Sequence, residues 1–311
     1  MLRRNPVRNR RTPTMNRMRI PIACLLLVLP PLLFAQPGPS AAQQQYDAAL
    51  LAAKAGQLDS ALAGVQRAII MDPGNAKAFK LRGDLNQRMD KSDAALEDYK
   101  MSEQLDPNNA RLYISRAALR ISKGMQKTAL KDCEKAIQLD PADPDGYYNR
   151  ACALYLGGNT EAARKDAEKA VKLKPDHADA LYLSGVTKGE LFQEEAGLAD
   201  IDAALKLKPS IPGGLMSMAV LLYEGERYEE AIDKFTEVID SDTSELAAAH
   251  YYRGDCFYHL KNKLKACEDY AASAALKDKD AIFIRKNYCE TDLEKIPKKP
   301  VRKHHRTMVE F

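Results

Sequence analysis

The sequence predicts an all-α protein built as a solenoid of antiparallel helix hairpins, because residues of one type recur at a fixed spacing of 34. One such column is proline: Pro73, Pro107, Pro141, Pro175 and Pro209. A second column holds small residues, namely Ala61, Ala95, Ala129, Ala163, Gly197, Ala231 and, after one inserted residue, Ala266. A third column is also small: Ala49, Gly83, Ala117, Ala151, Gly185, Ala219 and, past the same insertion, Gly254. Three columns at one spacing indicate tandem copies of one supersecondary unit.

The helices of the unit can be derived from one copy. Residues 145–156 carry apolar side chains at i, i+4 and i+7, which is one face of a helix. The pair Gly157-Gly158 breaks that helix, and a second helix with its own apolar face ends at Pro175. Two of the columns consist of small residues because the two helices touch where Ala151 meets Ala163. A larger side chain there would separate the backbones. Such a hairpin cannot bury its apolar face alone, so neighbouring hairpins must stack.

This pattern resembles the tetratricopeptide repeat (TPR) family, whose 34-residue unit has small residues at these places and a proline at its end. The resemblance implies a right-handed superhelix in which the first helix of each unit lines a concave groove. The seven units expected within 42–280 are 42–75, 76–109, 110–143, 144–177, 178–211, 212–246 and 247–280. The sixth unit lacks its proline, the seventh has Asp278 there, and Phe192 stands where a turn glycine is usual, which leaves the geometry of that turn open. Residues 281–294 are expected to form a capping helix.

The amino terminus has the pattern of an export signal. An arginine-rich stretch precedes sixteen uncharged residues, 20–35, that are too short for a membrane span and contain three prolines. We therefore expect residues 1–35 to be a signal peptide, cleaved after Ala35, with 36–41 as a linker. The start codon could equally be Met15 or Met18. This pattern favours a periplasmic or secreted protein of a bacterial cell envelope. A mitochondrial presequence and an uncleaved anchor are the alternatives.

The charge distribution argues against nucleic-acid binding. The net positive charge of the chain comes from its two termini, and the part between them has more acidic than basic residues. Binding to nucleic-acid phosphates needs a concentrated positive face, which this part does not offer. Residues 295–311 are basic and rich in proline, and we expect a disordered tail there. Its segment 295–306 offers weak contact with an anionic membrane as one interpretation, and a merely solubilising end as the other.

The groove implied by the resemblance supplies the candidate partner-binding residues. These are the tyrosines Tyr148, Tyr155, Tyr182, Tyr223, Tyr251 and Tyr258, and the charged residues Lys77, Lys80, Arg111, Asp145 and Asp179. Tyrosine suits peptide contact because it offers a large area, few rotors and a hydroxyl group. Plain packing is the alternative for each tyrosine. The basic residues lie in the early units and the acidic ones in the later units, which predicts a polar gradient that orients an extended peptide.

One specific activity of the family is excluded by the residues present. Members that bind chaperone tails hold a carboxylate with lysine, asparagine and arginine side chains. Here Asp84 and Asp145 stand at two of those positions, where they would repel a carboxylate. The chain also has no phosphate-binding loop, no Gly-x-Ser-x-Gly and no His-Glu-x-x-His motif. The sequence therefore predicts a non-enzymatic scaffold that binds a protein or peptide partner, with no cofactor. A structural component of the envelope, tethered by an uncleaved amino-terminal anchor and the basic tail, is the alternative.

The cysteines allow one disulfide within a hairpin. After the signal peptide the chain keeps five cysteines, so at least one thiol stays unpaired, and none forms a Cys-x-x-Cys pair. A Cys256–Cys267 disulfide is one interpretation of the seventh unit, and two small buried thiols is the other. His250 and His259 are nine residues apart, on opposite sides of a helix, so they cannot share one metal ion.

Overall fold

The computed structural model describes residues 39–241 and 245–297. Within these residues the regular structure is helical throughout, which confirms the predicted all-α repeat fold. Apart from Pro39 they belong to one compact unit that begins at Ser40. The expected signal peptide, residues 36–38 of the linker and the tail from residue 298 lie outside the described residues. None of the helices in the described part is long and apolar enough to span a bilayer.

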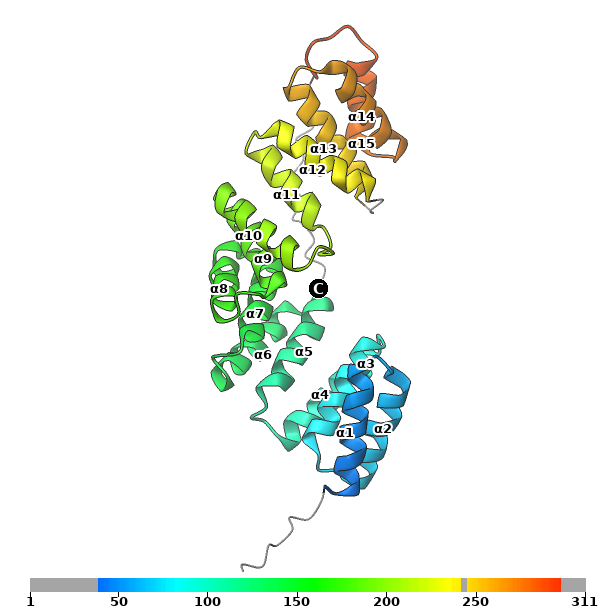
Figure 1. The fold of residues 1–311 in the computed structure, drawn as a ribbon, viewed down its shortest axis with the longest axis vertical. Helices are drawn as coiled ribbons and strands as arrows, with labels where there is room; N and C mark the ends of the chain where they lie inside the picture. Colours follow the sequence, from blue (N-terminus) through cyan, green and yellow to red (C-terminus); the bar gives the residue numbers. More distant parts are fainter. Residues whose placement is uncertain (1–38, 242–244, 298–311) are drawn as a thin grey trace, which may run out of the picture. The chain divides into compact units, whose positions relative to one another are not determined.

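Consecutive helices pair as hairpins (Figure 1). The first helices of the hairpins are α1 (Ala41–Lys54), α3 (Ala76–Arg88), α5 (Ala110–Ser122), α7 (Pro144–Leu156), α9 (Ala178–Glu190), α11 (Gly214–Glu224) and α13 (Leu246–His259). The second helices are α2 (Leu58–Met71), α4 (Ser92–Leu105), α6 (Gln126–Leu139), α8 (Thr160–Leu173), α10 (Glu194–Leu207), α12 (Tyr228–Asp240) and α14 (Lys263–Ala275). The described chain then adds α15 (Lys279–Ile284) and a π-helical turn, η1 (Arg285–Cys289).

The two columns of alanine and glycine residues mark where the two helices of a hairpin approach most closely. In the fifth hairpin, a Cβ added to Gly185 would lie 2.7 Å from the carbonyl oxygen of Gly197, closer than any side chain tolerates. The equivalent Ala151 and Ala163 of the fourth hairpin are both fully buried. These contacts bring the helix backbones together because no side chain stands between them.

The turn within each hairpin requires one residue with a positive φ. Gly56, Gly124 and Gly158 hold this place in three hairpins. Phe192 holds it in the fifth, with φ 59°, and its N–H donates to the Gly189 carbonyl at 2.9 Å. The turn left open by the sequence is thus the same Schellman turn that ends the other first helices. A positive φ is unfavourable for a bulky residue such as phenylalanine, whereas glycine adopts it readily. The backbone conformation of this turn therefore does not explain why phenylalanine is present.

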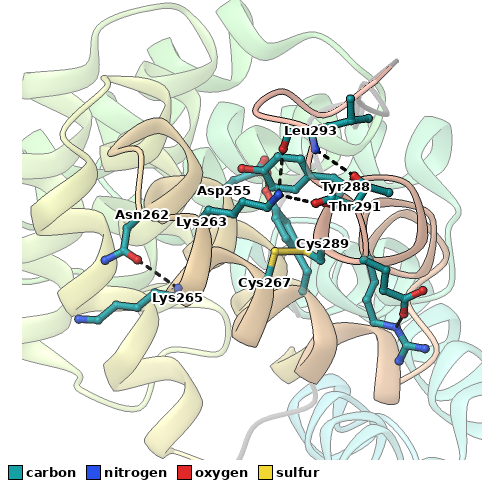
Figure 2. The surroundings of a disulfide bond; sticks show 12 residues. Asp255, Asn262, Lys263, Lys265, Cys267, Tyr288, Cys289, Thr291 and Leu293 are labelled. Carbon is teal, nitrogen blue, oxygen red and sulfur yellow. Dashed lines mark hydrogen bonds and ion pairs between the residues drawn. A yellow bond between two sulfur atoms is a disulfide. The ribbon is translucent and has the colours of Figure 1, made fainter.

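The carboxyl-terminal cap differs from the expected helix over 281–294. The helix ends at Cys289 because the chain beyond it is held from outside: the Lys263 ammonium donates to the carbonyl oxygens of Thr291 (2.7 Å) and Leu293 (2.9 Å). A disulfide between Cys267 of α14 and Cys289 fastens the same segment (Figure 2).

The Cys256–Cys267 interpretation is therefore wrong. Cys256 is fully buried on α13 and takes no part in the disulfide, because Cys267 bonds to Cys289. The reason is that Cys256 faces the core and Cys267 faces the cap. Cys133 and Cys152 are free thiols that are likewise buried, and burial raises the pKa of the Cys133 thiol to about 12, which makes it an inert packing residue.

Candidate functional site

The first helices of successive hairpins contact one another, for example α5 with α7, α7 with α9 and α11 with α13, and so form one face of the repeat. We call this the inner face. All the predicted partner-binding residues lie on its helices: Lys77 and Lys80 on α3, Arg111 on α5, Asp145, Tyr148 and Tyr155 on α7, Asp179 and Tyr182 on α9, Tyr223 on α11, and Tyr251 and Tyr258 on α13.

Three of the six tyrosines are core residues. The exposed fractions of Tyr155, Tyr182 and Tyr251 are 1%, 2% and 1%, so their rings present no surface to a partner. The Tyr155 hydroxyl donates to Glu190 on the next inner helix at 2.6 Å. Packing, the alternative left open by the sequence, describes these three side chains. Burial raises the pKa of Tyr182 to about 12, in keeping with an enclosed hydroxyl.

Tyrosines of the inner face, both buried and partly exposed, join neighbouring repeats. The Tyr182 and Ser217 hydroxyls lie 2.7 Å apart across α9 and α11, and the Tyr223 hydroxyl donates to Asp255 across α11 and α13 at 3.1 Å. Each pair connects first helices of consecutive units, because positions about 34 residues apart lie side by side on the inner face. The tyrosines that were predicted to form a binding surface therefore partly serve as contacts between repeats.

Tyr148, Tyr223 and Tyr258 remain partly exposed. Tyr223 and Tyr258 belong to an aromatic cluster near the carboxyl-terminal cap, where the Tyr258 ring lies 5.6 Å from that of Tyr288. Tyr148 has a different setting, since it lines a hollow on the inner face.

This hollow has a volume of about 470 Å³ and lies among α3, α5 and α7. Its lining combines apolar and polar side chains: Gln87, Asp90, Ser92, Ala118, Leu119, Ile121, Ser122, Lys123, Tyr148 and Asn149. The partly exposed Ala118 and Tyr148 form an apolar floor, behind which Leu119 and Ile121 are buried. Lys123 and Asp90 approach to 3.7 Å and are both well exposed. Its size is within the usual range of ligand sites. Lys123 was not predicted from the sequence, because as the residue just past the end of α5 it follows no column.

The predicted charge gradient is largely neutralised by local pairs. Arg111 and Asp145 occupy equivalent positions in neighbouring units, and the Arg111 guanidinium meets the Asp145 carboxylate at 2.6 Å. Lys80 pairs with Asp84 at 2.6 Å, and Asp179 pairs with Lys208 at 2.9 Å. Only the exposed Lys77, among the predicted charges, has no ion pair within the described residues. Most of the predicted charges are therefore paired locally instead of forming separate poles.

Asp145 is the centre of a connected group on this face. His177, at the start of α9, places its Nε2 atom 3.3 Å from Asp145, and its Nδ1 atom accepts from the backbone N–H of Ala180. The hydrogen bond from His177, with help from Arg111, lowers the pKa of the Asp145 carboxyl to about 2. Asp145 is thus a charged, fully engaged residue at neutral pH.

A second set of charges was missed in the sequence, although the 34-residue spacing could have revealed it. An arginine on the first helix of a hairpin binds an aspartate sixteen residues later on the second helix. The pairs are Arg82 with Asp98, Arg116 with Asp132, Arg150 with Asp166, and Arg253 with Asp269. They join the two helices of their hairpins, and Arg82 and Asp98 also line a hollow of about 590 Å³. In the part of the chain that the structure describes, no group of His, Cys, Asp or Glu side chains is placed to hold a metal ion.

Comparison with known proteins accords with this geometry. Models of the tetratricopeptide repeat match residues 46–110, 110–143, 144–177 and 216–281, more than half of the chain. No curated protein matches the chain.

Among solved structures, PilW, described as a widely conserved type IV pilus biogenesis factor, has a TM-score of 0.61 at 14% identity, over 68% of this chain and 98% of PilW. The protein pilF of Pseudomonas aeruginosa has a TM-score of 0.56 at 17% identity, over 65% of this chain and 91% of its own. A tetratricopeptide repeat protein of Parabacteroides merdae has 0.54 at 16% identity, over 78% and 95%. Likeness at these identities shows the fold, and with the repeat matches it establishes that the chain belongs to the tetratricopeptide repeat family.

Proposed function

We propose that this protein is a non-enzymatic scaffold that binds an extended segment of a partner protein in the hollow among α3, α5 and α7. A general role in protein interaction accords with the repeat family. The observation that carries the specific proposal is the lining of the hollow: an apolar floor of Ala118 and Tyr148 beside a rim of amide, hydroxyl and charged side chains. An apolar floor binds one side chain of a peptide, and rim groups such as Gln87 can bond to its main chain.

The rim residues also predict which side chains the bound segment carries. Lys123 and Asp90 are the cation and the acid among the lining residues, and they stand 3.7 Å apart. Their pair is loose and exposed, so it is easily exchanged for pairs with a ligand. We therefore expect an extended segment with one apolar side chain for the floor and a polar or acidic residue beside it for Lys123.

Selection from a random peptide library displayed on phage tests this proposal. Peptides selected on the full chain should bind about tenfold more weakly, or worse, to the Lys123→Glu variant, since the rim would repel an acidic residue. Lys127→Glu is the matched control: it makes the same change four residues later, at an exposed site of α6 outside the hollow. Equal affinities of selected peptides for both variants would refute binding in the hollow.

We also propose that the scaffold acts in an exported setting. The signal pattern of residues 1–35 motivates this, and the Cys267–Cys289 disulfide supports it, because such bonds persist in oxidising compartments. Amino-terminal sequencing of the protein from its native host is the test. A chain that begins near Gln36 is expected, and a chain that keeps residues 1–35 would favour a tethered structural component instead.

A further inference from the structure

The turns of the fifth and sixth hairpins expose a surface that the inner face does not include. We call residues 191–195 and 224–230 the turn edge. Phe192 is 83% exposed there and has the positive φ that glycine takes in three other hairpins. At the other end of the turn edge, the Tyr228 ring stacks on that of His259 at 4.7 Å, and His259 is exposed. Solvent-exposed aromatic side chains, together with the unfavourable backbone conformation of Phe192, indicate a surface that is normally covered.

The turn edge is one connected and acidic surface. The Arg227 guanidinium bridges the two turns, since it lies 3.1 Å from the Glu195 carboxylate and 2.6 Å from that of Glu230. The same two turns carry the acidic residues Glu194, Glu195, Glu226, Glu229 and Glu230. The excess of negative charge is much larger than Arg227 can compensate, so an occupant of this surface should be basic.

The described chain ends beside this surface. The bonds from Lys263 to Thr291 and Leu293, and the Cys267–Cys289 disulfide, hold the last residues against the start of α14 (Figure 2). Lys263 begins α14 directly after the turn that follows His259, and His259 stacks on Tyr228 of the turn edge. The segment that continues from Pro297 therefore departs from the turn next to the acidic one.

We propose that residues 298–311 of the same chain cover the turn edge. This segment carries Lys298, Lys299, Arg302, Lys303 and Arg306 against the single acid Glu310. Its last residues include Met308, Val309 and Phe311, which suit the exposed ring of Phe192. The inference is independent of peptide binding in the hollow, which lies on other hairpins.

The length of the segment permits this contact. Fourteen residues reach at most about 46 Å when fully extended. The path from α13 through α11 to α9 crosses two packed-helix spacings, about 20 Å. The tail can therefore reach Phe192 with its basic part lying along the glutamates.

Trypsin cleavage of the tail in the full chain tests the proposal, because its lysines and arginines are protected when they are bound. The edge variant combines Phe192→Gly, Glu226→Gln and Glu229→Gln. Glycine relieves the strained backbone at 192, so this variant should stay folded. We expect its tail to be cut about tenfold faster than that of the wild type at low salt. The control variant, Glu97→Gln with Glu134→Gln, removes two exposed carboxylates of α4 and α6, away from the turn edge, and should behave as the wild type.

Carbodiimide crosslinking of a mixture of isotopically light and heavy chains identifies the occupant. Crosslinks from Lys298, Lys299 or Lys303 to Glu226 or Glu229 within one chain are expected. Crosslinks between light and heavy chains would overturn the proposal in favour of a second copy. Equal rates of tail cleavage in the wild type and the edge variant would also overturn the proposal, because they would show that the turn edge does not protect the tail from trypsin.

Discussion

The Arg116–Asp132 pair offers the sharpest test of how the hairpins are held together. Both side chains are nearly buried, with exposed fractions of 7% and 5%. The Arg116 guanidinium donates to both carboxylate oxygens of Asp132, at 2.9 and 3.0 Å, and also to Glu103 at 2.6 Å. Arg120 adds a fourth bond, to Asp132, at 2.6 Å. The pair thus joins α5 to α6 and, through Glu103, to the α4 of the preceding unit.

Asp132→Ala should lower the free energy of unfolding by about 3–5 kcal/mol, because it leaves the buried Arg116 without its main counter-charge. That loss is a large share of the stability of an ordinary domain. The double variant Arg116→Met, Asp132→Leu should be much closer to the wild type, within about 1 kcal/mol, since apolar residues of similar size replace a buried pair with little cost. The sixth hairpin already does this in part, with Met218 at the arginine position and Lys234 at the aspartate position.

Urea unfolding followed by circular dichroism measures these differences. Glu134→Ala is the control, because Glu134 is exposed on the same helix, and it should change stability by less than about 0.5 kcal/mol. The reasoning would be refuted if Asp132→Ala matched this control, or if the double variant were as unstable as Asp132→Ala alone. Since stacked repeats depend on their neighbours, a broadened transition in Asp132→Ala would itself indicate the loss of a bridge between units.

Three further predictions concern other contacts. Ala163→Leu should overpack the fully buried contact in the fourth hairpin and cost about 1–3 kcal/mol in thermal unfolding, and an unchanged melting temperature would show that the helix register is wrong. The depressed pKa of Asp145 means that its contribution to stability is complete above about pH 4 and is lost as the pH falls towards 2, so Asp145→Asn should show a smaller loss over that interval in unfolding titrations. Cys267→Ser should remove about 3 kcal/mol from the stability of the cap, because the crosslink closes a loop with a sequence separation of 22, and a reductant should have no further effect on this variant.

The spacing of residue types along the chain was sufficient to predict the repeat and its hairpins. A spacing of 34 is a local property of the chain, and small residues such as Ala151 and Ala163 report directly on a close helix contact within one unit. Proline and glycine likewise mark turns through their own backbone preferences. Even Phe192 did not disturb this pattern, because the hydrogen bonds of the Schellman turn and the packing of both helices impose a positive φ on it.

Which residues of a column remain available to a partner depends instead on the packing of neighbouring hairpins. Tyr148 and Tyr182 occupy equivalent places, yet Tyr148 lines the hollow and Tyr182 is buried against Ser217, because burial depends on the side chains that the next hairpin contributes. In the same way, Arg111 and Asp145 look like opposite poles in the sequence but neutralise each other across one contact between repeats. The bond from Cys267 to Cys289 also depended on where the cap folds back. Periodicity predicts what recurs along the chain, whereas neighbouring repeats determine which of the recurring side chains stay exposed.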